Sequence, residues 1–222
     1  MGQEYTNGTE EVPTARPVLT RSTPLWIVAV LIVVALGAGY LLGRPTVPLD
    51  NSAEAGFLRD MSAHHSQAVD MSLIILEKTD EPRLSAVAAD ITRTQQAQIG
   101  RMQGWLARWE LGARGPEPPM TWMEGHGGHG GGEVPETMPG WVSDETMAEL
   151  RDAEDREAEI IFLEAMVGHH VGGIDMAEAA AVLAEEPKVV RLASGMAEAQ
   201  QSEIELMQDM LEERGADPVE ID

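Results

Sequence analysis

Residues 57–71 read FLRDMSAHHSQAVDM, and residues 162–176 repeat them in diverged form as FLEAMVGHHVGGIDM. The copies share a Phe-Leu pair, a Met four residues after the Phe, a His-His pair and a final Asp-Met pair. One offset of 105 residues relates all these positions, and it continues without a gap from Pro82 to Pro187 and between the glutamine pairs at 95–96 and 200–201. The chain therefore contains an internal duplication, and both copies are expected to form the same structural unit.

The repeated motif fits one face of an α-helix. At about 100° per residue, five positions of each copy gather in one stripe. They are Phe57, Met61, His64, Ala68 and Met71 in the first copy, and Phe162, Met166, His169, Gly173 and Met176 in the second. His65 lies at the edge of this stripe and Asp70 lies roughly opposite. Each copy therefore predicts a core-facing helix that presents an imidazole between two thioethers, with a second imidazole beside it.

The wider pattern predicts two helical hairpins. Pro82 and Pro187 each follow a short turn and stand where a helix begins, a position that favours proline. Only 4% of the residues are aromatic, which also favours helices over strands. We expect helices at about 53–78, 82–112, 143–185 (with a break near 151–155) and 187–214. The predicted fold is all-α, a ferritin-like four-helix bundle over residues 54–214. Its repeats, 54–112 and 143–214, are joined by a long crossover at 113–142 and followed by a tail at 215–222.

The segment before the bundle has a different composition. Residues 1–24 are polar and are expected to form a disordered cytoplasmic tail. Residues 25–43 are 19 residues without a charge, close to the ~20 that a transmembrane helix needs. A cleaved signal peptide has a shorter apolar core and a small-residue cleavage site, which the linker at 44–53 lacks. The sequence therefore predicts a single-pass anchor in the cell membrane, with the C-terminal domain outside the cytoplasm.

Charge and cysteine content exclude several classes of function. The net charge of −23 argues against a nucleic-acid partner, because phosphate binding needs clustered Lys and Arg. The absence of cysteine excludes disulfides, iron–sulfur sites and thiol nucleophiles. An acidic surface suits solubility first and cation binding second. Nothing in the sequence identifies a protein partner.

The repeated histidines and methionines form a set of candidate metal ligands. Thioether sulfur suits Cu(I), and imidazole accepts either copper state as well as zinc or nickel. The predicted ligands are His64, His65, His169, His170, Met61, Met71, Met166 and Met176. Copper is the favoured metal, ahead of zinc or iron. The alternative for these methionines is ordinary core packing, and for a single buried histidine a structural hydrogen bond.

The crossover holds the two remaining histidines, His126 and His129, in a Gly-rich stretch that also contains methionines. It is either a flexible second metal site or a solvated spacer, and the sequence leaves both open. A di-iron carboxylate site would need Glu three residues before a histidine on two helices, but Met61 and Met166 occupy those places. No Ser-His-Asp set, P-loop or dinucleotide fingerprint is present, so no catalytic residue is predicted.

The double His-His motif, together with Pro139-Gly140 and the acidic helix start at 143–145, resembles the bacterial family catalogued as domain of unknown function 305. The resemblance covers roughly residues 54 to 214. It implies a ferritin-like, extracytoplasmic bundle with metal-binding histidines at His64, His65, His169 and His170, since some members are associated with copper. One departure is the glycine content of the second copy at 168, 172 and 173, which predicts a less regular helix there.

Three functions are consistent with these features. The leading hypothesis is a membrane-anchored, extracytoplasmic protein that binds copper for sequestration or transfer. The second is a non-catalytic cell-envelope interaction or structural module, whose histidines form a buried polar network. The third is a metal-dependent oxidoreductase, for which the sequence offers no recognisable substrate pocket.

Overall fold

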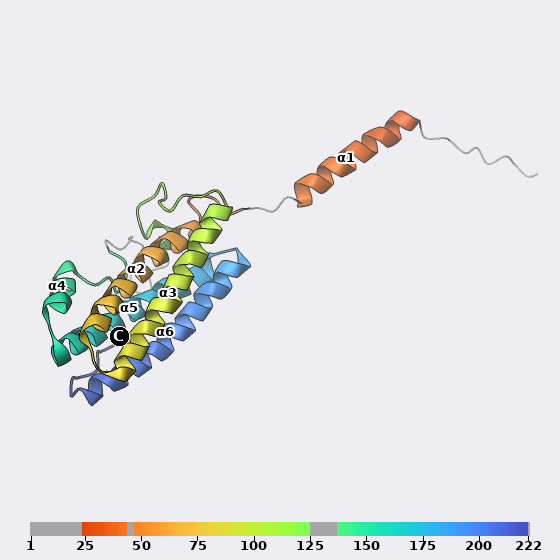
Figure 1. The fold of residues 1–222 in the computed structure, drawn as a ribbon. Coiled ribbons are helices and arrows are strands. Elements are labelled where there is room, and N and C mark those ends of the chain that lie inside the picture. Colours follow the sequence, from red (N-terminus) through yellow and green to blue (C-terminus); the bar gives the residue numbers. More distant parts are fainter. Residues whose placement is uncertain (1–23, 44–46, 125–136, 222) are drawn as a thin grey trace, which may run out of the picture. The chain divides into compact units, whose positions relative to one another are not determined.

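The structure, a computed structural model, describes residues 24–43, 47–124 and 137–221, apart from the side chains of residues 41 and 42. The chain divides into two compact units, residues 1–46 and residues 47–222. In the first unit the described residues form helix α1, Leu25–Gly43. All the other helices formed by described residues lie in the second unit (Figure 1).

The predicted helix at 25–43 is present, but its assignment as a membrane anchor is not supported. Among the described residues, no helix combines the length and the apolarity needed to cross a membrane.

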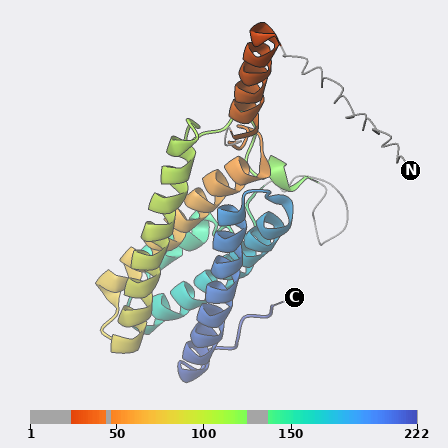
Figure 2. The same cartoon turned by 90° about the vertical axis from the view of Figure 1, so that its right-hand side faces the viewer.

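The second unit is built from two helical hairpins, as the duplication predicts. The first hairpin is α2 (Ala53–Lys78) with α3 (Pro82–Arg108), and the second is α5 (Asp155–Leu183) with α6 (Pro187–Glu213). The two repeat-bearing helices, α2 and α5, pack against each other. Figure 2 shows the bundle turned by 90° from the view of Figure 1. No strand occurs among the described residues, so the all-helical prediction is confirmed.

Local sequence signals explain the helix ends. The Ser52 side chain accepts a hydrogen bond from the Ala55 N–H, and the Ser143 side chain caps α4 (Asp144–Asp152) in the same way. The break expected near 151–155 lies between α4 and α5. The helix predicted to end near residue 112 ends earlier, at Arg108, because Glu110 adopts a positive φ of 62°.

The duplicated stripes form the centre of the bundle. All ten stripe positions are buried, including Phe57, Phe162, Ala68 and Gly173. The apolar core has two clusters: Met71 and Met166 belong to one, and Met61 and Met176 belong to the other. Each cluster therefore takes methionines from both copies of the motif.

The prediction of an irregular helix at the second motif is wrong, because α5 runs without interruption through its glycines. A Cβ on Gly172 would lie 2.1 Å from the carbonyl carbon of Pro139, so this position has no space for a side chain. Gly140 has a φ of +67°, and a Cβ there would lie 2.5 Å from the Gly168 carbonyl oxygen. Glycine at positions 140 and 172 therefore allows the end of the crossover to pack directly against the backbone of α5.

Candidate metal centre

The four motif histidines meet inside the bundle. His64 and His65 come from α2, and His169 and His170 come from α5. All four side chains are at most 1% exposed. The His64 and His169 rings have centroids 3.7 Å apart and are tilted by 31°, and the His169 and His170 centroids are 6.3 Å apart. The structure therefore brings the two predicted pairs into one cluster.

Each ring is held by a hydrogen bond at Nε2. His64 Nε2 donates to the Pro139 carbonyl at 3.0 Å, and His169 Nε2 donates to the His64 carbonyl at 3.1 Å. The outer histidines bond to the outer helices: His65 Nε2 lies 2.6 Å from Gln98 Oε1, and His170 Nε2 lies 2.7 Å from Glu203 Oε2. Since carbonyl and carboxylate oxygens only accept, Nε2 carries a proton in each ring, and Nδ1 is the nitrogen that can offer a lone pair when the ring is neutral.

All four Nδ1 atoms are buried and have no hydrogen-bond partner. Such atoms are rare in folded proteins, because a buried polar atom without a partner is destabilising. In metalloproteins a ligating histidine typically uses one ring nitrogen for the metal and donates the other N–H to a carbonyl or carboxylate. The four imidazoles have this arrangement, with Nδ1 as the available nitrogen.

The surroundings keep three of these imidazoles neutral. Burial, opposed by the bond to Pro139, lowers the pKa of His64 from 6.5 to about 4. Burial and the neighbouring His64 lower the pKa of His65 to about 3. The pKa of His169 falls well below its usual value, because of burial and the three other histidines. A neutral imidazole is the form that binds a metal, so the ligand form is present at neutral pH.

The predicted methionine ligands are also at the centre. Met61, Met71, Met166 and Met176 are all fully buried. They flank the histidines along α2 and α5, where Met102 and Met207 from the outer hairpin helices join the same two core clusters. Thioether sulfur is therefore available on both sides of the imidazole cluster.

The donor set fits a soft metal ion without forming a complete site. Among the described residues, no group of three or more His, Asp or Glu side chains is arranged to hold a metal. Copper(I) accepts a small number of imidazole and thioether ligands, and both kinds are buried here. Binding would therefore recruit thioether sulfur or require a small rotation of the rings.

Four further polar residues surround the histidine cluster and were not predicted as site residues. Gln98 and Glu203 bind the outer histidines, and Gln95 and Gln200 are buried with unpartnered amide atoms. Their signal in the sequence is the same 105-residue offset, which relates 95 to 200 and 98 to 203. The Pro139 carbonyl could not be found in this way, because a backbone acceptor leaves no mark on residue identity.

The described part of the crossover is packed against the bundle. Met120 is 1% exposed, and its N–H donates to Asp60 Oδ2 at 2.7 Å. Trp122 Nε1 donates to the same oxygen at 2.9 Å. His126 and His129 lie outside the described residues, so the choice between a second metal site and a spacer stays open.

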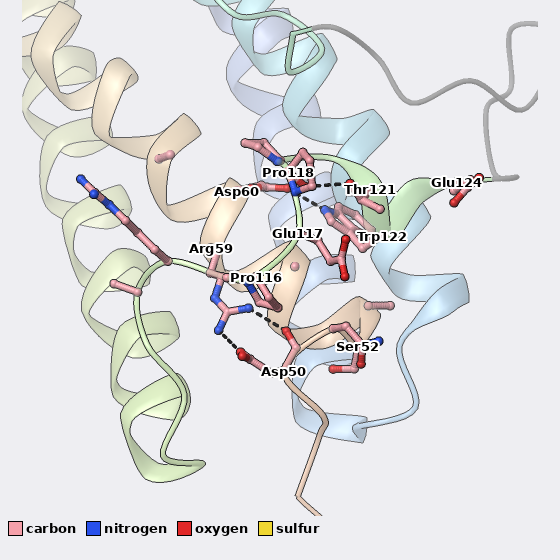
Figure 3. A pocket seen from close by; sticks show the side chains of 18 of the residues that line it. Asp50, Ser52, Arg59, Asp60, Pro116, Glu117, Pro118, Thr121, Trp122 and Glu124 are labelled. Carbon is pink, nitrogen blue, oxygen red and sulfur yellow. Dashed lines mark hydrogen bonds and ion pairs between the residues drawn. The ribbon is translucent and has the colours of Figure 1, made fainter.

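A surface pocket of about 800 Å³ lies between the start of α2 and the crossover (Figure 3). Two of its charged side chains are used in local contacts: Arg59 bonds to Asp50 and to the Gly112 carbonyl, and Asp60 accepts a hydrogen bond from Trp122 Nε1. None of the motif histidines lines this pocket. The buried imidazole cluster is therefore the stronger candidate for the functional site.

Comparison with known families agrees with this geometry. The family model described as Domain of unknown function (DUF305) matches residues 54–211, which is more than half of the chain. The chain belongs to the DUF305 family. The resemblance inferred from the His-His motifs is thereby confirmed.

Solved structures of DUF305 proteins share this fold. One from Streptomyces coelicolor, described as secreted, is 42% identical with a TM-score of 0.71, and the match covers 78% of this chain and 100% of that chain. A DUF305 fragment from Deinococcus radiodurans is 28% identical with a TM-score of 0.61, covering 77% and 99%. CopM in its Cu(I)-bound form is 23% identical with a TM-score of 0.54, covering 75% and 97%.

A curated relative matches only part of the DUF305 chain. Uncharacterized protein L153 of Acanthamoeba polyphaga mimivirus is 38% identical over 55 residues. The match covers 25% of this chain and 36% of that protein, so it spans about a third of the relative's length.

Proposed function

We propose that this DUF305 domain binds copper in its core, for sequestration or transfer. The ligands are drawn from His64, His65, His169 and His170, with Met61, Met71, Met166 and Met176 supplying thioether sulfur. The observation that carries the proposal is the set of four buried, unpartnered Nδ1 atoms, each on a ring oriented through Nε2. CopM, which shares the fold, is known in Cu(I)-bound, Cu(II)-bound and Ag-bound forms, in agreement with copper as the metal.

The test is a Cu(I) competition titration of the full chain against a chromophoric chelator, with bound copper counted by elemental analysis. The variant His65→Gln/His170→Gln keeps an N–H donor for Gln98 and Glu203 but removes two imidazole lone pairs. We expect its Cu(I) affinity to fall at least tenfold, since each replaced ligand would leave the ion undercoordinated. The matched variant is His126→Gln/His129→Gln in the crossover.

The outcomes separate the possible sites. Loss of binding in the core variant alone supports the proposal. Loss in the crossover variant alone moves the site to residues 126 and 129. A parent chain that retains no copper would overturn the proposal.

A second function is favoured by a different observation. The four Nε2 bonds each join separate elements: α2 to the crossover, α2 to α3, α5 to α2 and α5 to α6. A non-catalytic envelope module held together by this polar network would need the same bonds. Its thermal unfolding temperature would not respond to copper or chelator, whereas a copper-binding domain gains stability from any ligand that binds only the folded state.

We also propose that the bundle works outside the cytoplasm. The support is the Streptomyces coelicolor protein, which is 42% identical and is described as secreted. A C-terminal alkaline phosphatase fusion would be active only if the domain is exported.

A further inference from the structure

The two halves of the histidine cluster differ at one matched position. Residues 98 and 203 are equivalent under the 105-residue offset, but one is glutamine and the other is glutamate. Both accept from the outer histidine of their own hairpin, at 2.6 Å for His65–Gln98 and 2.7 Å for His170–Glu203. The hydrogen-bond geometry is therefore the same, and the difference is one of charge.

This difference bears directly on metal binding. A carboxylate that accepts from Nε2–H makes the bond charge-assisted and pushes electron density into the ring, which strengthens Nδ1 as a donor. A neutral amide oxygen does so much less. Glu203 also brings a negative charge next to a buried ring, since its side chain is 22% exposed while that of His170 is 0% exposed. A cation on His170 Nδ1 would be partly compensated by this charge, which His65 lacks.

Three other features of the two histidines are matched. Both are at most 1% exposed, both have an unpartnered Nδ1, and each follows a histidine whose Nε2 bonds to a backbone carbonyl. Position 98/203 therefore makes the hydrogen-bond partners of the two outer histidines unequal in charge.

We propose that Glu203 is a positioning residue that makes His170 a stronger metal ligand than His65, so that the second copy of the motif dominates cation binding. This inference rests on the proposed copper function and adds to it a ranking of the two outer histidines by the strength with which they bind the metal. The first copy, with Gln98, would then be the weaker half from which an ion is more readily released.

The duplication supplies its own controls. The variant Glu203→Gln makes the second copy like the first, and Gln98→Glu makes the first like the second. The double exchange Gln98→Glu/Glu203→Gln keeps the net charge and reverses the asymmetry. Glu205→Gln removes the same charge from an exposed position two residues away on α6.

The experiment measures Cu(I) affinity by chelator competition for these full-length variants. We expect Glu203→Gln to weaken binding about 10- to 100-fold, the range found for partners of metal-bound histidine. Glu205→Gln should change the affinity less than threefold. In the parent, His170→Gln should weaken binding more than His65→Gln, and in the double exchange this order should reverse. The ¹⁵N shift of the outer imidazole in the metal-free protein should move with residue 203 and not with residue 205.

The possible failures are distinct. If the parent binds no copper, the proposed function itself is overturned. If the parent binds but Glu203→Gln behaves like Glu205→Gln, or if the order of the two histidines does not reverse in the double exchange, copper binding stands and this inference is overturned. Urea unfolding of each metal-free variant shows whether a lost affinity reflects lost folding, and the double exchange, which keeps both hydrogen bonds, remains decisive if a single variant unfolds.

Discussion

One buried glutamine in the core is expected to lower the stability of the metal-free protein. Gln200 is 4% exposed, and neither its Oε1 nor its Nε2 has a partner. Each such atom destabilises a fold by about 1–3 kcal/mol. Gln200→Leu should therefore raise the free energy of unfolding of the metal-free protein by about 1–2 kcal/mol, measured by urea denaturation. The exposed neighbour change Gln201→Leu should stay within about 0.5 kcal/mol. A loss of stability in Gln200→Leu would mean that the amide has a partner, such as a buried water.

The candidate ligands could be predicted from the sequence, because the donor atoms of histidine and methionine side chains follow from residue type alone. The stripe positions, including His64 and His169, are buried as predicted. The supporting groups were missed because two of them, the carbonyls of Pro139 and His64, belong to the backbone. Gln98 and Glu203 carry the duplication offset, but their role appears only when the outer helices are placed beside the histidines.

At the scale of elements, the packing of the crossover against α5 can be tested by substituting two glycines of that helix. A Cβ on Gly172 would lie 2.1 Å from the Pro139 carbonyl carbon and 2.3 Å from the Gly140 nitrogen, and neither backbone atom can turn away. Gly172→Ala should therefore destabilise the protein by about 1–3 kcal/mol through overpacking, and displace the acceptor of His64. Gly168→Ala on the same helix meets no heavy atom within 4 Å. It should be neutral or stabilising by up to about 1 kcal/mol. If urea denaturation gave the two substitutions equal effects on the free energy of unfolding, this packing of the crossover against α5 would be contradicted.

Helix positions followed from periodicity and capping, which act within a few residues. Ser52, Ser143 and the prolines at 82 and 187 all stand where the sequence placed helix starts. The glycines at 168, 172 and 173 suggested an irregular helix, but α5 is continuous, and Pro139 and Gln200 occupy the space that side chains at 172 and 173 would fill. Such long-range contacts cannot be derived from local propensity.

The whole molecule is expected to lose stability in mild acid when it is free of metal. The pKa values of His64 and His65 are lowered to about 4 and about 3, and that of His169 is lowered well below its usual value. Because these folded-state values lie below the unfolded value of 6.5, the unfolded chain binds more protons between pH 6.5 and 4. Stability is then complete above about pH 6.5 and falls as the pH drops below it, by up to about 1.4 kcal/mol per pH unit for each histidine.

Urea denaturation of the metal-free chain at pH 7.0, 6.0 and 5.0 checks this expectation. The midpoint should fall at each step, and a flat profile would contradict the buried, neutral state of the rings. This acid sensitivity follows from burial alone, so a metal site and a structural polar network both produce it. Saturating Cu(I) distinguishes them, because a proton and a metal compete for Nδ1. A copper-binding centre should shift the whole profile to lower pH, whereas a purely structural network should give the same midpoints with and without copper.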